Sequence, residues 1–300
     1  MRVLVNGAAF ELAAAPGANL GDVLSEADEL LDKAGSVIIG IRIDGAEVDA
    51  DNYPSFSSRS LDGIDTVEIH AENASSMKAK ALETLLELVA LSTQAAKSAS
   101  ESTTAQDWSA LRKGATDLRD AFAGLFAADE LSLAQAFADT LAKSGDDPSF
   151  EVRSEISAQA ARLDPIFSER LAELRAPVQE MRSAAELFAS RSGALGDLPV
   201  LLHTGKEDQA MREVLFFIEI FNKVIRLIPE LRKSGVDTAS LMVGDSSLAD
   251  FYTDFNRVLR ELTDAFEHKD AVLIGDLAEY EVLPRMTKFF TAMREALPGK

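Results

Sequence analysis

Met1-Arg-Val-Leu-Val-Asn-Gly-Ala-Ala-Phe-Glu-Leu12 predicts a β-hairpin at the start of the chain. Apolar and polar residues alternate up to Val5, and Ala8–Leu12 returns as a second strand. Between them Asn6-Gly7 is the strongest two-residue signal for a hairpin turn. Because each strand has a single apolar side, this hairpin needs another layer against which to pack.

A helix and three further strands are predicted between residues 20 and 71. Apolar residues recur every three or four positions from Leu20 to Ala34, and Gly35 follows where a C-terminal cap belongs. The further strands are Ser36–Ile43, Ala46–Val48 after the turn Asp44-Gly45, and Thr66–Ala71. The compact way to bury this pattern is a helix laid across one face of a four- or five-stranded sheet.

The first 72 residues resemble a ubiquitin-like β-grasp domain. The Val3-Leu-Val-Asn-Gly7 hairpin and the helix near residue 20 are similar to those of small sulfur-carrier proteins. The resemblance implies a fold and no particular activity. Sulfur carriers and ubiquitin end in a free Gly-Gly tail, whereas Ala71 continues into Glu72-Asn-Ala-Ser-Ser76, and no Gly-Gly pair occurs in the chain. Transfer of that tail's chemistry is therefore not expected.

Composition excludes several classes of function. The 300 residues allow about two domains, and a net charge of −20 disfavours binding to a phosphate backbone. The absence of cysteine excludes disulfides, thiolate nucleophiles and iron–sulfur clusters. Residues 1–72 hold 14 acidic and 4 basic side chains, which favours basic partners. Neither a membrane span nor a signal peptide is expected, and a cytoplasmic protein is predicted.

The remainder of the chain shows only helical patterning, so the predicted class is α+β, an N-terminal β-grasp module followed by an all-α helical-bundle region. The predicted domains are residues 1–72, a helical region 73–192 with a long helix 148–192, and a C-terminal bundle 206–300. Pro165 and Pro177 are expected to kink or interrupt the long helix. A hinge is predicted at Ser192–Gly205, and Thr204–Glu207 is expected to form a capping box. The other expected helices are Met77–Ser98, Gln106–Ala128, Leu131–Lys143, 210–228, Leu248–Phe266 and Ala271–Leu297.

The residues that could carry chemistry favour structural roles. None of His70, His203 and His268 belongs to a Glu-x-x-His pair of the kind that binds two metals in a helical bundle. Gly205-Lys206 resembles the end of a phosphate loop, but Val200 stands where glycine is needed and Glu207 replaces the hydroxyl residue. The carboxylates are most simply a solvated acidic face. The pairs weighed as acid–base candidates are Asp250 with Asp254, Asp264 with His268, and Asp276 with Glu279 and Tyr280. No catalytic residue, cofactor or metal is predicted.

The segment Ala271–Pro284 is the strongest candidate for a partner-binding surface. Gly275 inside a helix costs about 1 kcal/mol relative to alanine, which suggests close approach of another backbone. Pro284 also breaks a helix that pure packing would keep regular. The alternative is that the segment is simply core. The candidate partner-binding residues are Phe216, Phe217, Phe221, Leu273, Gly275, Leu277, Tyr280 and Leu283.

The predicted function is a non-enzymatic protein–protein interaction protein, an adaptor or structural component of an assembly. Its contacts are expected at the sheet edge and in the helical grooves. One alternative is a chaperone-like bundle that grips an amphipathic client segment, since Asp254–Pro284 resembles flagellin-export-type helical chaperones. The other alternative is a carboxylate-based enzyme. The expected partners are proteins that are basic or present an amphipathic helix, and self-assembly stays open.

Overall fold

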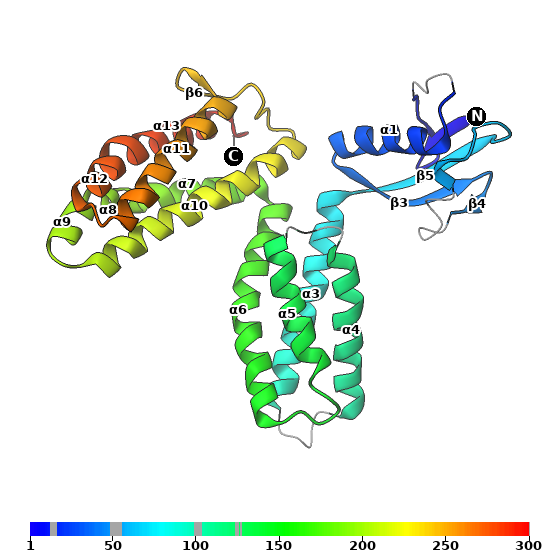
Figure 1. Cartoon of the computed structure of the whole chain (residues 1–300), viewed down its shortest axis with the longest axis horizontal. Helices are drawn as coiled ribbons and strands as arrows, with labels where there is room; N and C mark the ends of the chain where they lie inside the picture. Colours follow the sequence, from blue (N-terminus) through cyan, green and yellow to red (C-terminus); the bar gives the residue numbers. More distant parts are fainter. Residues whose placement is uncertain (13–16, 49–55, 99–103, 124–125, 127, 300) are drawn as a thin grey trace. The chain divides into compact units, whose positions relative to one another are not determined.

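The computed structural model describes residues 1–12, 17–48, 56–98, 104–123, 126 and 128–299. The chain is an α+β protein with a five-stranded N-terminal sheet and a mainly helical remainder (Figure 1). It forms two compact units, Met1–Leu171 and Ala172–Lys300. No helix within the described ranges has the length and apolar character needed to cross a bilayer.

The N-terminal sheet has the strand order β2-β1-β5-β3-β4. Its central pair, β1 and β5, is parallel, and the other neighbours are antiparallel. Helix α1 covers one face of the sheet, and its apolar residues pack on Val67 and Ile69 of β5. The elements are β1 (Arg2–Val5), β2 (Ala8–Ala9), α1 (Leu20–Lys33), β3 (Ser36–Ile43), β4 (Ala46–Glu47) and β5 (Thr66–Asn73).

Both predicted hairpin turns are confirmed. Asn6 and Gly7 have φ of 51° and 81°, and Asp44 and Gly45 have φ of 50° and 82°, as a type I′ turn requires. The return strands β2 and β4 are only two residues long, shorter than the predicted Ala8–Leu12 and Ala46–Val48. Such short edges offer few free backbone groups to a partner strand, which weakens the expectation of contacts at the sheet edge.

Among the described residues, four long helices follow the sheet and lie side by side in Figure 1, and the last of them extends past Leu171 into the second unit. Asn73 ends β5 and caps the first of them, since its side chain accepts a hydrogen bond from the Ser76 amide. The sheet therefore continues into the bundle without a separate linker. Trp108, Phe122, Phe137 and Phe167 fill the bundle core. The helices are α3 (Ala74–Lys97), α4 (Ala105–Ala123), α5 (Ala128–Ala142) and α6 (Phe150–Arg175).

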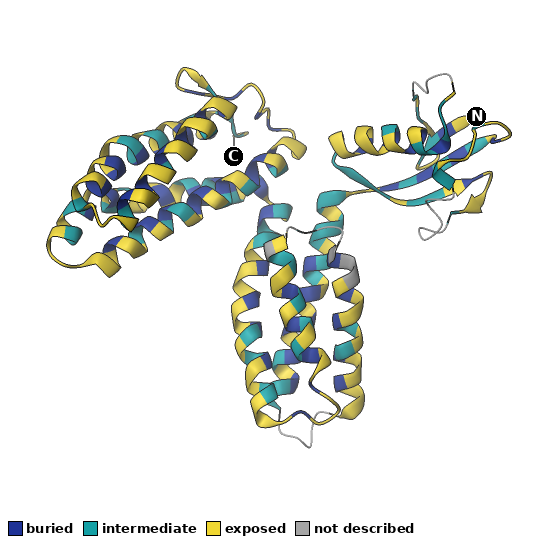
Figure 2. Ribbon diagram, viewed as in Figure 1, coloured by how far each residue is buried: buried dark blue, intermediate teal, exposed yellow. Residues whose placement is uncertain are grey.

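The second unit is a helical bundle with one small hairpin. Its buried residues form a single apolar cluster rich in phenylalanine, and Figure 2 shows them along the helix sides that face neighbouring helices. The elements are α7 (Pro177–Arg191), α8 (Gly193–Gly196), α9 (Leu198–His203), α10 (Glu207–Lys233), β6 (Met242–Val243), β7 (Ser246–Ser247), α11 (Leu248–Glu267), α12 (Ala271–Asp276), the π-helix η2 (Leu277–Val282) and α13 (Leu283–Ala296).

The predicted boundary between the two helical regions lies at the wrong place in the sequence. The boundary between the units falls at Leu171/Ala172, so residues 172–192 belong to the C-terminal bundle. The single helix 148–192 is two helices, because Pro177 begins α7 while Pro165 remains inside α6. The predicted hinge at 192–205 instead forms α8 and α9, since Leu195 and Leu198 are drawn into the core.

Two predicted helix starts also differ. Helix α6 begins at Phe150, two residues after Pro148, and the Ser149 hydroxyl accepts a hydrogen bond from the Val152 amide. Helix α10 has no side-chain cap, so the capping box is wrong. The Thr204 hydroxyl donates to the Val200 carbonyl at the end of α9 instead.

Candidate docking surface

The segment α12–η2 has a buried side and a side exposed to solvent. Ile274, Leu277, Ala278 and Val282 belong to the apolar core. The exposed side carries three large apolar side chains, Val272, Leu273 and Tyr280, whose exposed fractions are 62%, 43% and 62%. We call these three side chains the apolar triad. Exposed apolar side chains that form a contiguous patch mark interaction sites.

Gly275 allows α9 to lie close against α12. A Cβ atom at this position would lie 2.5 Å from Cγ of Pro199, which is too short for any carbon–carbon contact. The sequence predicted close approach of another backbone here. The group that approaches is the ring of Pro199, and it holds α12 against the bundle.

Gly275→Ala is therefore expected to destabilise the C-terminal unit by about 1–3 kcal/mol through overpacking. At an unobstructed helical position the same change would stabilise by up to about 1 kcal/mol. Thermal unfolding followed by far-UV circular dichroism measures the difference. Gly193→Ala in α8 is the matched control, because nothing lies within 4 Å of its added Cβ. Stabilisation by Gly275→Ala would contradict the close contact with Pro199.

The expected helix Ala271–Leu297 is divided by the π-helix η2. Pro284 has no N–H with which to bond the Tyr280 carbonyl four residues earlier, so one hydrogen bond of a regular α-helix is lost at this turn. A π-turn accommodates the irregularity, and such turns are frequent at functional sites. It places Tyr280 on the solvent side of the segment while Leu277 and Val282 stay buried.

The structure separates the eight predicted partner-binding residues into three groups. Phe217, Phe221, Gly275 and Leu277 are buried, so they cannot contact a partner of the folded protein. Phe216 and Leu283 are half-buried, and the Arg191 guanidinium lies 4.7 Å from the Phe216 ring centroid. Only Leu273 and Tyr280 are exposed. Val272 was missed, although its position beside Leu273 in an irregular helix is a signal that could have pointed to it.

An open depression of about 560 Å³ lies beside Leu273. The end of α11 and the start of α12 form it, and its lining residues are Glu261, Asp264, Ala265, His268, Asp270 and Leu273. Asp270 caps α12, because its Oδ1 accepts a hydrogen bond of 3.0 Å from the Leu273 amide. Nδ1 of His268 lies 2.7 Å from the Asp264 carbonyl oxygen, so the ring contacts backbone.

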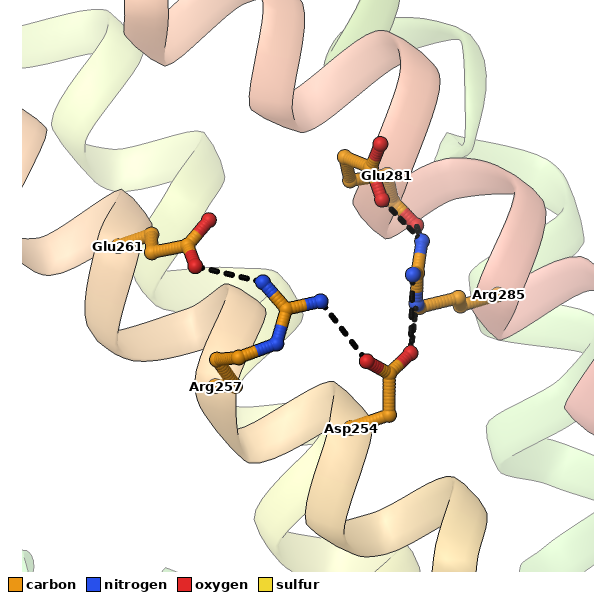
Figure 3. Close-up of polar contacts among 5 residues, drawn as sticks. All are labelled: Asp254, Arg257, Glu261, Glu281 and Arg285. Carbon is orange, nitrogen blue, oxygen red and sulfur yellow. Dashed lines mark hydrogen bonds and ion pairs between the residues drawn. The ribbon is translucent and has the colours of Figure 1, made fainter.

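An ion-pair network ties α11 to η2 and α13 (Figure 3). Asp254 accepts hydrogen bonds from Arg257 at 2.8 Å and from Arg285 at 2.9 Å. Arg257 also donates to Glu261, and Arg285 donates to Glu281. The hydrogen bonds from Arg257 and Arg285 hold the pKa of Asp254 below its usual value. Asp254 is therefore ionised at neutral pH and acts as an anchor between helices rather than as an acid.

The pKa of Asp254 gives a direct test of this network. Arg285→Ala is expected to raise it toward the ordinary value of about 3.9, because one donor and one positive charge are lost. A carboxyl-carbon NMR titration measures the change, with Lys288→Ala on α13 as control. Since the folded-state pKa is lowered, ionised Asp254 stabilises the fold above its ordinary pKa, and this contribution is lost as pH falls through the folded-state value. An unchanged pKa in Arg285→Ala would contradict the contact.

Of the other acid–base candidates, Asp264 and His268 line the depression described above, and the rest make local contacts or are exposed. Asp250 belongs to the start of α11, where its amide bonds the Ser247 hydroxyl, and Asp276 and Glu279 are exposed on α12–η2. Nδ1 of His203 lies 2.7 Å from the Pro199 carbonyl oxygen. Among the described residues, no group of three or more acidic or histidine side chains is arranged to hold a metal ion.

Comparison with known proteins gives matches at both ends of the chain. Residues 1–73 match a family described as "TP0873 N-terminal domain", and residues 179–292 match one described as "Domain of unknown function (DUF8042)". An uncharacterized protein of Treponema pallidum (strain Nichols) is 25% identical over 104 residues. That alignment covers 35% of this chain and 52% of the relative, so the chain spans about half the relative's length. No solved structure matches.

Proposed function

We propose that this protein is a non-enzymatic interaction protein, an adaptor or structural component of an assembly, that docks its partner on α12–η2. The observation that carries the proposal is the apolar triad, Val272, Leu273 and Tyr280. These side chains are held in place by a buried side packed in the core and by the contact of Gly275 with Pro199. A rigid apolar anchor loses little conformational entropy on binding, and tyrosine is frequent among the residues that dominate binding energy.

The N-terminal sheet supports a second part of this proposal, that the first module is a β-grasp domain. A helix across one face of a five-stranded sheet is the arrangement that the resemblance implies, and the hairpin β1–β2 opens it as expected. Without a Gly-Gly tail after β5, this module serves as a further binding surface.

Site-specific photocrosslinking in the source cells tests the docking surface. Benzoylphenylalanine in place of Tyr280 is expected to give one abundant adduct with a single protein. The matched control places the same group at Ile225 on α10, which is also exposed, and should give no such adduct. Equal adducts from both positions would contradict docking on α12–η2. Many weak adducts with different proteins would contradict an adaptor and favour chaperone-like gripping.

A further inference from the structure

We infer that the occupant of this surface is a basic amphipathic helix, whose apolar side contacts the apolar triad and whose lysines and arginines face the acidic depression. This inference rests on the proposed function and names the chemistry of the partner.

The side chains that line the depression beside the triad carry mainly negative charge. The depression beside Leu273 is lined by the carboxylates of Glu261, Asp264 and Asp270, and no lysine or arginine is among its described lining residues. Asp276 and Glu279 add two exposed carboxylates on the same segment as the triad.

Two arginines near this region are already paired, whereas Lys269, in sequence between the lining residues His268 and Asp270, is exposed and offsets part of the negative charge. Arg257 binds Asp254 and Glu261, and Arg285 binds Asp254 and Glu281. Asp264 makes no ion pair with a described residue. A partner with positive charge therefore gains attraction at the depression, while an acidic partner is repelled.

The spacing of the triad suits a helix. Leu273 and Tyr280 are seven residues apart, which corresponds to at most about 10 Å along the segment, because its second part is a π-helix. A partner helix offers apolar anchors one to two turns apart within the same range, and this is the usual pattern of a helix bound in a groove. A partner strand would instead use a sheet edge, and both edge strands here have two residues.

Two other occupants are less compatible with this surface. A nucleic acid carries the same sign of charge as the depression. A second copy of this chain, with its net charge of −20, would bring carboxylates close to carboxylates if the same face were used twice.

Three synthetic peptides of one length test the occupant against the full chain by fluorescence anisotropy. The first has leucines on one helical face and lysines beside them, the second has glutamates in place of the lysines, and the third has the first peptide's composition in scrambled order. The first peptide is expected to bind at least tenfold more tightly than the others, and its binding should weaken as salt is added. Binding of the acidic or scrambled peptide with equal affinity would overturn the inference.

Charge-removing variants locate the binding. The triple variant Glu261→Gln, Asp264→Asn, Asp270→Asn should weaken the basic peptide about tenfold, and asparagine at 270 retains the helix cap. The matched control removes three exposed carboxylates elsewhere in the same unit, by Glu186→Gln, Glu219→Gln and Asp245→Asn. It should change affinity less than twofold.

The outcomes separate this inference from the proposed function. Equal losses of affinity in the two triple variants would show that the basic peptide is attracted to the acidic protein in general. The depression would then be wrong as the binding site. If no peptide binds while Tyr280 still gives its single photoadduct, the docking surface stands and the basic helix is wrong as its occupant. If benzoylphenylalanine at position 280 gives no adduct, the proposed function itself is contradicted.

Discussion

Phe255→Ala is expected to lower the free energy of unfolding of the C-terminal unit by about 3–5 kcal/mol. The Phe255 side chain is fully buried, and its ring centroid lies 4.6 Å from that of Phe221 and 5.5 Å from that of Phe251. The cavity beside it measures only about 10 Å³, so the surrounding side chains have little free volume into which to relax. The truncation should therefore leave most of the ring's volume empty.

Urea unfolding measures this effect with two probes. Far-UV circular dichroism follows the helices, whereas fluorescence reports Trp108, the sole tryptophan, which lies in the first unit. The Phe255→Ala transition should move in circular dichroism and stay fixed in fluorescence. Leu187→Ala, at a side chain that is 46% exposed on α7, is the control and should change stability by about 0.5 kcal/mol or less. An equal shift of the Trp108 transition would contradict separate unfolding of the two units.

Glu173→Ala is expected to destabilise the same unit by about 3 kcal/mol. Glu173 is only 3% exposed, and both of its carboxylate oxygens accept hydrogen bonds from Arg226, at 2.8 Å and 3.0 Å. Removing one member of a buried pair leaves the other charge without compensation. The Arg226 side chain is 31% exposed, so water reduces the loss to the lower end of the usual range.

The double variant Glu173→Met, Arg226→Met distinguishes the effect of losing the ion pair from the effect of losing side-chain packing. It should be more stable than Glu173→Ala, because no buried charge is left unpaired. Glu186→Ala, an exposed position on α7, is the single-site control. If the double variant is less stable than Glu173→Ala, packing by the aliphatic parts of the two side chains dominates. Loss of the ion pair would then not be the cause of the destabilisation.

The N-terminal sheet could be predicted well because its signals are local. Asn6-Gly7 and Asp44-Gly45 adopt positive φ in adjacent positions, which few other dipeptides tolerate. The alternation along Thr66–Ala71 likewise marks one buried face, and Val67, Ile69 and Ala71 are buried as expected.

The helical region was less predictable because its boundaries depend on tertiary packing. Apolar residues recur every three or four positions from Ile156 to Phe188, across Pro177, although Ile156 and Phe188 belong to different units. The glycines between 193 and 205 predicted a hinge, but Leu195 and Leu198 supply enough burial to form two short helices.

The candidate surface was located only in part. Leu273 and Tyr280 were identified from the irregular composition of their segment. Phe217 and Phe221 share the apolar character of a binding surface, and only their neighbours in the fold show that they are core. Aromatic content therefore predicted the core of this unit better than it predicted the partner surface.

The parallel pairing of β1 with β5 has a consequence for synthesis on the ribosome. Arg2 pairs with Thr66, so β1, which is synthesised first, lacks its parallel partner until β5 has been synthesised. At roughly 5–20 residues per second, translation of the roughly 60 residues between them takes about 3–12 s. During that time one edge of Arg2–Val5 has no partner strand. A nascent chain stalled before Thr66 should therefore be vulnerable to proteases and chaperones at its N-terminus, and one released beyond Asn73 should be protected.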